Sequence, residues 1–256
     1  MSAQIKTCFN GCSFTVGEGF PLGERINYIY TNLLAKKFRV EQQNIAIGGS
    51  SNHTIFMRSV SAIQSQKYDI VFTQWSALNR IWLYPGPDCY FFINDEKYPD
   101  FRYRDVYISK KDKQKLKETL LILNHDYQNI FELIDYCKIL AQLGTIHKTK
   151  IIFINGLVPW ENDLVKPLTN DLSMSLSNYT KSILDFDNRG DHEILEYFIK
   201  LQNKFLEVDQ TKWVNLFESF QKNIVDVGLE GHHPGIKSHQ WMANQTANYI
   251  IENKII

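Results

Sequence analysis

Four short apolar runs divide the chain into segments. They cover residues 5–9, 44–47, 69–74 and 150–155, and each is rich in Ile, Val or Phe and soon followed by Gly, Ser or Asn. Continuous apolarity, rather than alternation of apolar and polar positions, is typical of strands that are covered on both faces. The runs therefore predict four buried strands of a mostly parallel sheet.

The segments between these runs show the periodicity of helices. Apolar residues recur there at spacings of three and four, and a last helix is predicted to begin near Pro234, because proline is favoured in a first helical turn. Strands that alternate with helices predict a sheet with helices on both of its faces. The helical stripes are Ile26, Ile29, Tyr30, Leu33 and Leu34; Ile55, Val60 and Ile63; and Ile130, Leu133, Ile134, Cys137 and Leu140.

Two stretches interrupt this alternation. Residues 76–112 are rich in Trp, Tyr and Phe, and residues 157–190 are polar and rich in turn-forming residues. Long irregular connections in a compact domain often carry function. A chain of 256 residues is long enough to bury one large core. We therefore predict a single domain over residues 1–256 with insertions at about 76–112 and 157–190.

Composition excludes several classes of partner. The 28 basic and 28 acidic residues balance, so the overall field does not favour nucleic acid or an anionic membrane. No apolar segment approaches the roughly 18 residues of a membrane span, and the N-terminus lacks the pattern of a secretory signal. The four cysteines form no disulfide or zinc-binding framework. We expect a reduced, cytoplasmic protein without a membrane span.

Polar clusters follow the first three predicted strands. Residues 11–13, 48–52 and 74–76 come directly after these strands, and residues 230–235 precede the last predicted helix. Parallel α/β sheets bind their ligands outside the carboxyl ends of the strands. We therefore expect these four segments to meet at one edge of the sheet.

Ser13 is a candidate nucleophile at this edge. A serine hydroxyl needs a base within hydrogen-bond reach, usually a histidine oriented by a carboxylate, and N–H donors for the developing oxyanion. His233 is a candidate base, and Glu230 comes three residues before it. The backbone N–H groups of Gly48 and Gly49 are candidate donors. The pattern G-x-S-x-G is not satisfied, because Thr15 stands at the second glycine position.

The segments NGCSFTVGEG, NIAIGGSSNHTI, DIVFTQWS and EGHHPG occur in the order of the conserved blocks of the SGNH (GDSL-like) hydrolases. The chain resembles this family, and in particular its divergent bacterial and phage members with a Gly-Cys-Ser-Phe-Thr first block. The resemblance implies a three-layer α/β/α sandwich with a five-stranded, mostly parallel sheet of flavodoxin-like type. It also implies hydrolysis of esters, often acetyl groups on carbohydrates, without a metal or other cofactor.

The resemblance also implies roles for individual residues. Ser13 corresponds to the nucleophile and His233 to the base. Glu230 stands where the family usually has an aspartate, and Asp226 is the alternative orienting carboxylate. The glycine that donates to the oxyanion corresponds to Gly48 or Gly49, and we favour Gly49, together with the N–H group of Ser13.

The third block departs from the family pattern. The asparagine that would supply the third oxyanion donor is absent, and the candidates in its place are Gln74, Ser76 and Asn79. Four further residues are candidate substrate contacts, each with a plainer alternative. The Trp side chains either close the core or stack on sugar rings, Arg80 pairs either with an acidic substrate or with a surface carboxylate, and Asn52 either contacts substrate or supports the second-block loop. These four are Asn52, Trp75, Arg80 and Trp82.

The sequence thus predicts a serine esterase with a Ser-His-Glu triad and an acyl-enzyme, removing an acetyl or other short acyl group from a carbohydrate or glycoconjugate. Two alternatives use the same fold: an O-acyltransferase that acts on a sugar hydroxyl, and a glycan-binding module that has lost catalysis. A metal site at His232, His233 and His239 is disfavoured, because no carboxylate or cysteine at ligand spacing accompanies them.

Overall fold

The computed structural model describes residues 4–76, 80–82, 90–92, 126–155, 213–215, 225–229, 231 and 233–256. Five strands form one parallel sheet in the order β2-β1-β3-β6-β7. Numbered along the chain within this sheet, the order is 2-1-3-4-5, which is one of the two common orders of doubly wound α/β proteins. The strands are β1 (Lys6–Asn10), β2 (Glu41–Asn44), β3 (Ile70–Trp75), β6 (Lys150–Asn155) and β7 (Trp213–Asn215).

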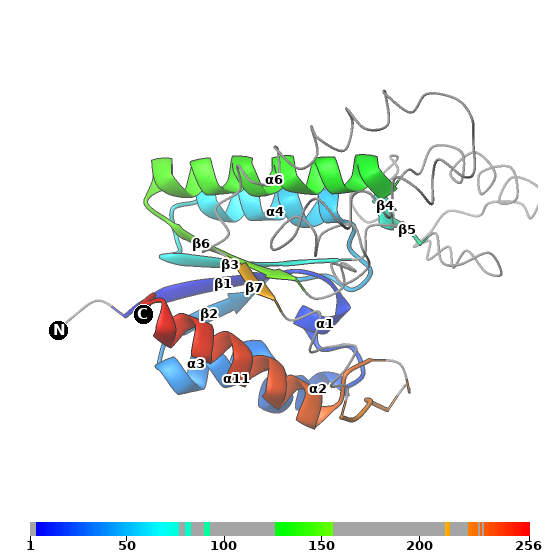
Figure 1. Cartoon of the computed structure of the whole chain (residues 1–256). Coiled ribbons are helices and arrows are strands. Elements are labelled where there is room, and N and C mark those ends of the chain that lie inside the picture. Colours follow the sequence, from blue (N-terminus) through cyan, green and yellow to red (C-terminus); the bar gives the residue numbers. More distant parts are fainter. Residues whose placement is uncertain are drawn as a thin grey trace, which may run out of the picture.

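Helices cover both faces of this sheet (Figure 1). One face carries α4 (Asn52–Gln64) and α6 (Asp126–His147), and the other carries α3 (Tyr30–Phe38) and α11 (Ile236–Glu252). Two shorter helices, α1 (Ser13–Val16) and α2 (Leu22–Tyr28), lie between β1 and α3 in the chain. A separate antiparallel pair consists of β4 (Arg80–Trp82) and β5 (Tyr90–Phe92). The predicted fold class, a three-layer α/β/α sandwich with a five-stranded parallel sheet, is confirmed.

Two hydrophobic cores explain why the strands are apolar throughout. Successive residues of a strand point to opposite faces of the sheet. In β1, Cys8 packs into the core under α4 and α6, whereas Phe9 packs into the core over α3 and α11. Phe9 stacks on Phe72 of β3, with ring centroids 4.4 Å apart. Both faces of the central strands are therefore buried, as the continuous apolar runs predicted.

The second strand lies elsewhere than predicted. The apolar run at 44–47 predicted a strand there, but β2 covers Glu41–Asn44, a polar stretch. Among the described strands, β2 lies at the edge of the sheet and pairs with β1 alone, and its residues are exposed or half-buried. An edge strand needs no continuous apolar run, so hydrophobicity did not reveal it. The predicted run begins where the ladder ends, with Ile45 N–H donating to the carbonyl of Phe9 at 2.8 Å.

The first predicted helical stripe is divided in two. Ile29 has an extended backbone (ψ 141°) and separates α2 from α3. The insertions at 76–112 and 157–190 lie outside the described residues except for Ser76, β4 and β5, so the domain boundaries remain a prediction. In the part of the chain that the structure describes, no helix has the length and apolarity needed to cross a bilayer.

Candidate active site

The candidate site lies at the carboxyl ends of β1 and β3. From β1 the chain continues to β2 on one side, and β3 lies on the other, so the strand order reverses here. Ligands of open α/β sheets bind at such a switch point. Ser13 is the first residue of α1, three residues beyond the end of β1, and α1 follows the carboxyl end of β1 (Figure 1). Ser13 is 2% exposed, and its hydroxyl forms no hydrogen bond with the described residues.

His233 lies in a loop that packs on the segment following Ser13. The ring of Phe14 meets the ring of His233 edge-on, with centroids 5.8 Å apart. Leu229 N–H donates to the carbonyl of Gly19 at 3.1 Å, and Gly228 N–H donates to the carbonyl of His233 at 2.7 Å. Two segments about 220 residues apart in sequence therefore meet, as the predicted mechanism requires.

The imidazole of His233 contacts a carboxylate rather than the candidate nucleophile. Its Nε2 atom lies 3.3 Å from Oε2 of Glu18, and no hydrogen bond joins it to the hydroxyl of Ser13. Glu18 N–H in turn donates to the carbonyl of Ser13 at 2.9 Å. Glu18 was not among the residues predicted from the sequence. The signal for it was an acidic residue between two glycines, five positions after the candidate nucleophile.

Of the two carboxylates predicted to orient His233, only Asp226 lies within the described residues. Glu230 lies outside the described residues, as does His232. Asp226 is described, and its carboxylate accepts hydrogen bonds from the N–H groups of Lys237 and Ser238, each at 2.9 Å, and from the Ser238 hydroxyl. Asp226 therefore accepts hydrogen bonds from backbone N–H groups in the first turn of α11 and pairs with neither nitrogen of His233.

These contacts also act on the ionisation of Asp226. Partial burial alone raises the pKa of its carboxyl group, but the hydrogen bonds from Lys237 and Ser238 outweigh burial and hold the pKa below its ordinary value. The carboxylate is thus ionised at neutral pH. An anion at the N-terminal end of α11 is also favoured by the helix dipole.

The segment of Gly48 and Gly49 lies beside the end of β1. Ile47 N–H donates to the carbonyl of Gly11 at 3.3 Å, which ties the second polar cluster to the first. Gly49 has a positive φ of 75°. Within the described residues, the N–H groups of Ser13, Gly48 and Gly49 donate to no acceptor. These three N–H groups are therefore the candidate oxyanion donors of the site.

The candidates for a third oxyanion donor lie at the end of β3. Oε1 of Gln74 accepts hydrogen bonds from the hydroxyls of Thr15 and Tyr30, and its Nε2 is buried without a partner among the described residues. The Ser76 hydroxyl is also buried without a partner there. Asn79 lies outside the described residues. Gln74 and Ser76 both remain candidates.

The predicted substrate contacts fall in different places. Both amide atoms of Asn52 bind the backbone of Ser76, at 2.7 Å and 3.2 Å, so Asn52 joins the start of α4 to the end of β3. Trp75 is fully buried and stacks against Tyr136 and Phe153. Its ring therefore closes the core rather than forming a wall for sugar rings. Arg80 and Trp82 lie in β4, of which only the backbone is described.

His239 has a structural environment. It is fully buried on α11, between the rings of Phe20 and Tyr30, and its Nδ1 accepts the N–H group of Tyr30 at 3.3 Å. Burial lowers the pKa of its imidazole to about 4. No group of three or more potential metal ligands occurs in the described residues.

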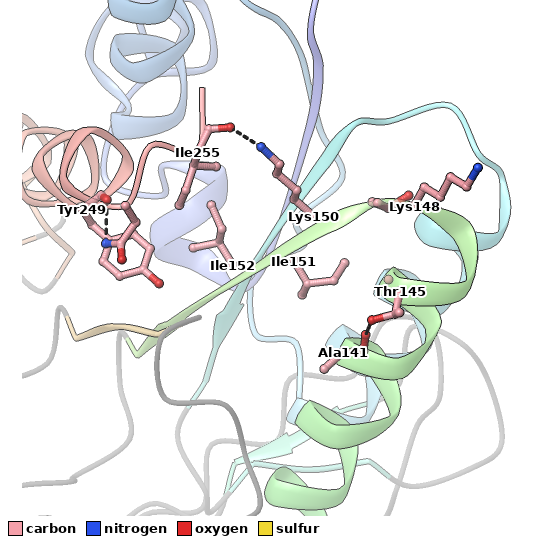
Figure 2. Close-up of a pocket in the computed structure, with 11 residues that line it drawn as sticks. Ala141, Thr145, Lys148, Lys150, Ile151, Ile152, Tyr249 and Ile255 are labelled. Atoms are coloured by element: carbon pink, nitrogen blue, oxygen red, sulfur yellow. Dashed lines mark hydrogen bonds between the residues drawn. The ribbon is translucent and has the colours of Figure 1, made fainter.

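A cavity lies near the amino end of β6 (Figure 2). This cavity of about 460 Å³ lies between the end of α6, the start of β6 and the end of α11. Lys148, Lys150 and Tyr249 line it, and Nζ of Lys150 donates to the carbonyl of Ile255 at 2.6 Å. None of the candidate catalytic residues lines this cavity. It also lies at the amino end of β6, where sheets of this type do not bind their ligands, so we place no chemistry there.

The fold and this site define a doubly wound α/β protein with a buried serine at the switch point of its sheet. No protein-family model matches the chain, and no curated protein sequence matches it with significance.

Among solved structures, the acetylxylan esterase Axe2 from Geobacillus stearothermophilus is 14% identical to this chain. It matches with a TM-score of 0.48 over 98% of this chain and 96% of its own. A protein assigned to the G-D-S-L lipolytic family, from Desulfitobacterium hafniense DCB-2, is 13% identical. Its TM-score is 0.42 over 96% of this chain and 99% of its own. At these identities the similarity concerns the fold, and the activity has to be argued from the residues of this chain.

Proposed function

We propose that this protein is a serine esterase that removes an acetyl or other short acyl group from a carbohydrate or glycoconjugate. One observation carries the proposal: the segment of Ser13 and the loop of His233 pack on each other at the switch point of the sheet, with Phe14 against the His233 ring. A buried serine beside a histidine is the minimum constellation for acyl transfer through a covalent intermediate.

In the first chemical step, the Ser13 oxygen attacks the ester carbonyl while Nε2 of His233 takes the hydroxyl proton. For this transfer Nε2 has to exchange its contact with Glu18 for one with the Ser13 hydroxyl. The tetrahedral intermediate then collapses, the bond to the sugar oxygen breaks, and that oxygen receives the proton from His233. The products of this half-reaction are the free sugar hydroxyl and an acyl group on Ser13.

In the second step, water attacks the acyl-enzyme. His233 takes a proton from the water and returns it to the Ser13 oxygen as the carboxylic acid leaves. We propose that Glu230 orients His233 throughout. The oxyanion of both tetrahedral intermediates is held by the N–H groups of Ser13 and Gly49 and by a third donor, Gln74 or Ser76, each of which is worth about 10²–10³-fold in rate.

The experiment that tests this function compares Ser13→Ala with a matched serine substitution. Ser61→Ala serves as the control, because Ser61 is exposed on α4. Hydrolysis of a simple acetyl ester should fall on the order of 10³-fold or more in Ser13→Ala and stay unchanged in Ser61→Ala. Undiminished hydrolysis in a folded Ser13→Ala protein would end the assignment. Mass analysis of the products with added sugar would separate release of the acyl group to water from its transfer to a hydroxyl.

A further inference from the structure

We propose that Glu18 is the specificity-determining residue of the Ser13 site. Its carboxylate selects esters whose alcohol part is neutral or cationic, such as neutral or amino sugars, over esters that carry a carboxylate beside the scissile bond. This inference rests on the proposed function, and it narrows the substrate class.

The backbone of Glu18 is fixed relative to both proposed catalytic residues. Its N–H group donates to the carbonyl of Ser13. Gly17 and Gly19, on either side of Glu18, have φ angles of 78° and 100°, which L side chains rarely adopt. A Cβ atom at Gly19 would lie 2.9 Å from Cβ of His233. The chain therefore reverses directly after α1, close against His233.

The carboxylate of Glu18 lies between the proposed base and the second polar cluster. One of its oxygens, Oε2, is 3.3 Å from Nε2 of His233. The carboxylate also lies against Gly48 so closely that a Cβ atom there would be 1.7 Å from Oε1 and 3.0 Å from Oε2. Gly48 thus leaves the space that the carboxylate fills. Nε2 is the atom that must face the reacting ester, so Glu18 lies on the substrate side of the imidazole.

A ligand can reach this carboxylate. The side chain of Glu18 is 24% exposed, whereas Ser13 is 2% exposed. Glu18 contacts Nε2 of His233, the atom that has to pass a proton to the departing alcohol, so an ester attacked by Ser13 brings its alcohol oxygen towards this carboxylate. A like charge about 4 Å away, at the effective dielectric of a protein surface, changes affinity about tenfold or more. A site that disfavours anionic esters does not agree with the other role considered for Arg80, which was to pair with an acidic sugar.

The test uses three acetyl esters of similar size that differ in charge: 3,3-dimethylbutyl acetate (neutral), acetylcholine (cationic) and acetoxyacetate (anionic). The variant is Glu18→Gln, which keeps the shape of the side chain and removes its charge. Glu24→Gln on α2 is the control, because Glu24 is an exposed acid in the same part of the chain. The quantity compared is kcat/KM for each charged ester divided by kcat/KM for the neutral one.

In Glu18→Gln the ratio for acetoxyacetate should rise about tenfold and the ratio for acetylcholine should fall several-fold, while Glu24→Gln leaves both ratios unchanged. Added salt should shrink the difference in the wild type. Equal ratios in Glu18→Gln and wild type would overturn the inference, because a purely positioning role for Glu18 would slow all three esters alike. Absence of Ser13-dependent hydrolysis in the wild type would instead overturn the proposed function, and this inference with it.

A single-turnover measurement covers the case in which Glu18→Gln turns over too slowly. Covalent modification of Ser13 by a neutral and by an anionic phosphonate ester, followed by mass spectrometry, gives the same ratio without turnover. The anionic reagent should gain about tenfold relative to the neutral one in Glu18→Gln. Loss of both modifications in the folded variant would overturn the inference, since it would place the Glu18 carboxylate in the proton transfer itself.

Discussion

His233 and His239 lie six residues apart, one in the loop before α11 and the other within the helix, yet their surroundings differ. His239 is fully buried between aromatic rings, and its imidazole, with a pKa of about 4, is neutral at physiological pH. His233 has a carboxylate oxygen 3.3 Å from Nε2 and lies beside the segment of Ser13. Both histidines are buried, and they differ in what surrounds the ring: His239 is enclosed by aromatic rings, whereas His233 has a carboxylate against Nε2.

Substitution of His233 should lower turnover, whereas substitution of His239 should mainly lower stability. In His233→Asn, turnover of an acetyl ester should fall on the order of 10³-fold, because His233 is the proposed base that takes the Ser13 proton. Thermal unfolding should change less than in His239→Asn, since His239 is fully buried between the rings of Phe20 and Tyr30. The contrast would fail if His239→Asn, in a folded state, lost as much activity as His233→Asn.

The pH dependence of stability sharpens the same contrast. The pKa of the His239 imidazole is about 4 in the folded protein, whereas an unperturbed histidine, as in the unfolded chain, has a pKa of 6.5. Between these values the unfolded chain binds more protons than the folded one, so stability is lost as pH falls from about 6.5 to about 4. This loss should amount to about 3 kcal/mol. Denaturant unfolding at several pH values measures it, and His239→Leu should flatten the curve within this window. An unchanged curve in His239→Leu would contradict the buried neutral imidazole.

The two carboxylates of the loop at 225–235 allow a matched comparison. Glu230→Gln should lower turnover by about 10²-fold, because Glu230 is the proposed triad carboxylate that orients the base. Asp226→Ala should instead lower the free energy of unfolding by about 1 kcal/mol, since it removes the acceptor for the first turn of α11. Esterase kinetics and denaturant unfolding of both variants separate the roles. A larger kinetic loss in Asp226→Ala than in Glu230→Gln would exchange the assignments.

Most of the sheet could be predicted from the sequence, because burial on both faces imposes a continuous apolar run. β1 and β3 were predicted to within one residue and β6 to the residue. β2 could not be placed this way, since an edge strand tolerates polar residues such as those of Glu41–Asn44. The break between α2 and α3 was also missed, because the apolar stripe continues through Ile29 while its backbone becomes extended.

The candidate site divides in a similar way. The positions of Ser13 and of the second cluster follow from the carboxyl ends of predicted strands. The contact between Glu18 and His233 does not, because it depends on two left-handed glycines and on a loop that returns from the far end of the chain. The burial of Trp75 was also open, since an aromatic residue at the end of a strand suits a core and a sugar-binding wall equally well.

Covalent modification by a fluorophosphonate, which reacts with activated serine hydroxyls, tests the roles of Ser13 and His233 together when the modified residue is mapped. In the wild-type protein, peptide mass spectrometry should find the adduct on Ser13, and in His233→Asn the same peptide should stay unmodified. An adduct on another serine, or none at all on the folded wild-type protein, would contradict an esterase built on Ser13 and His233.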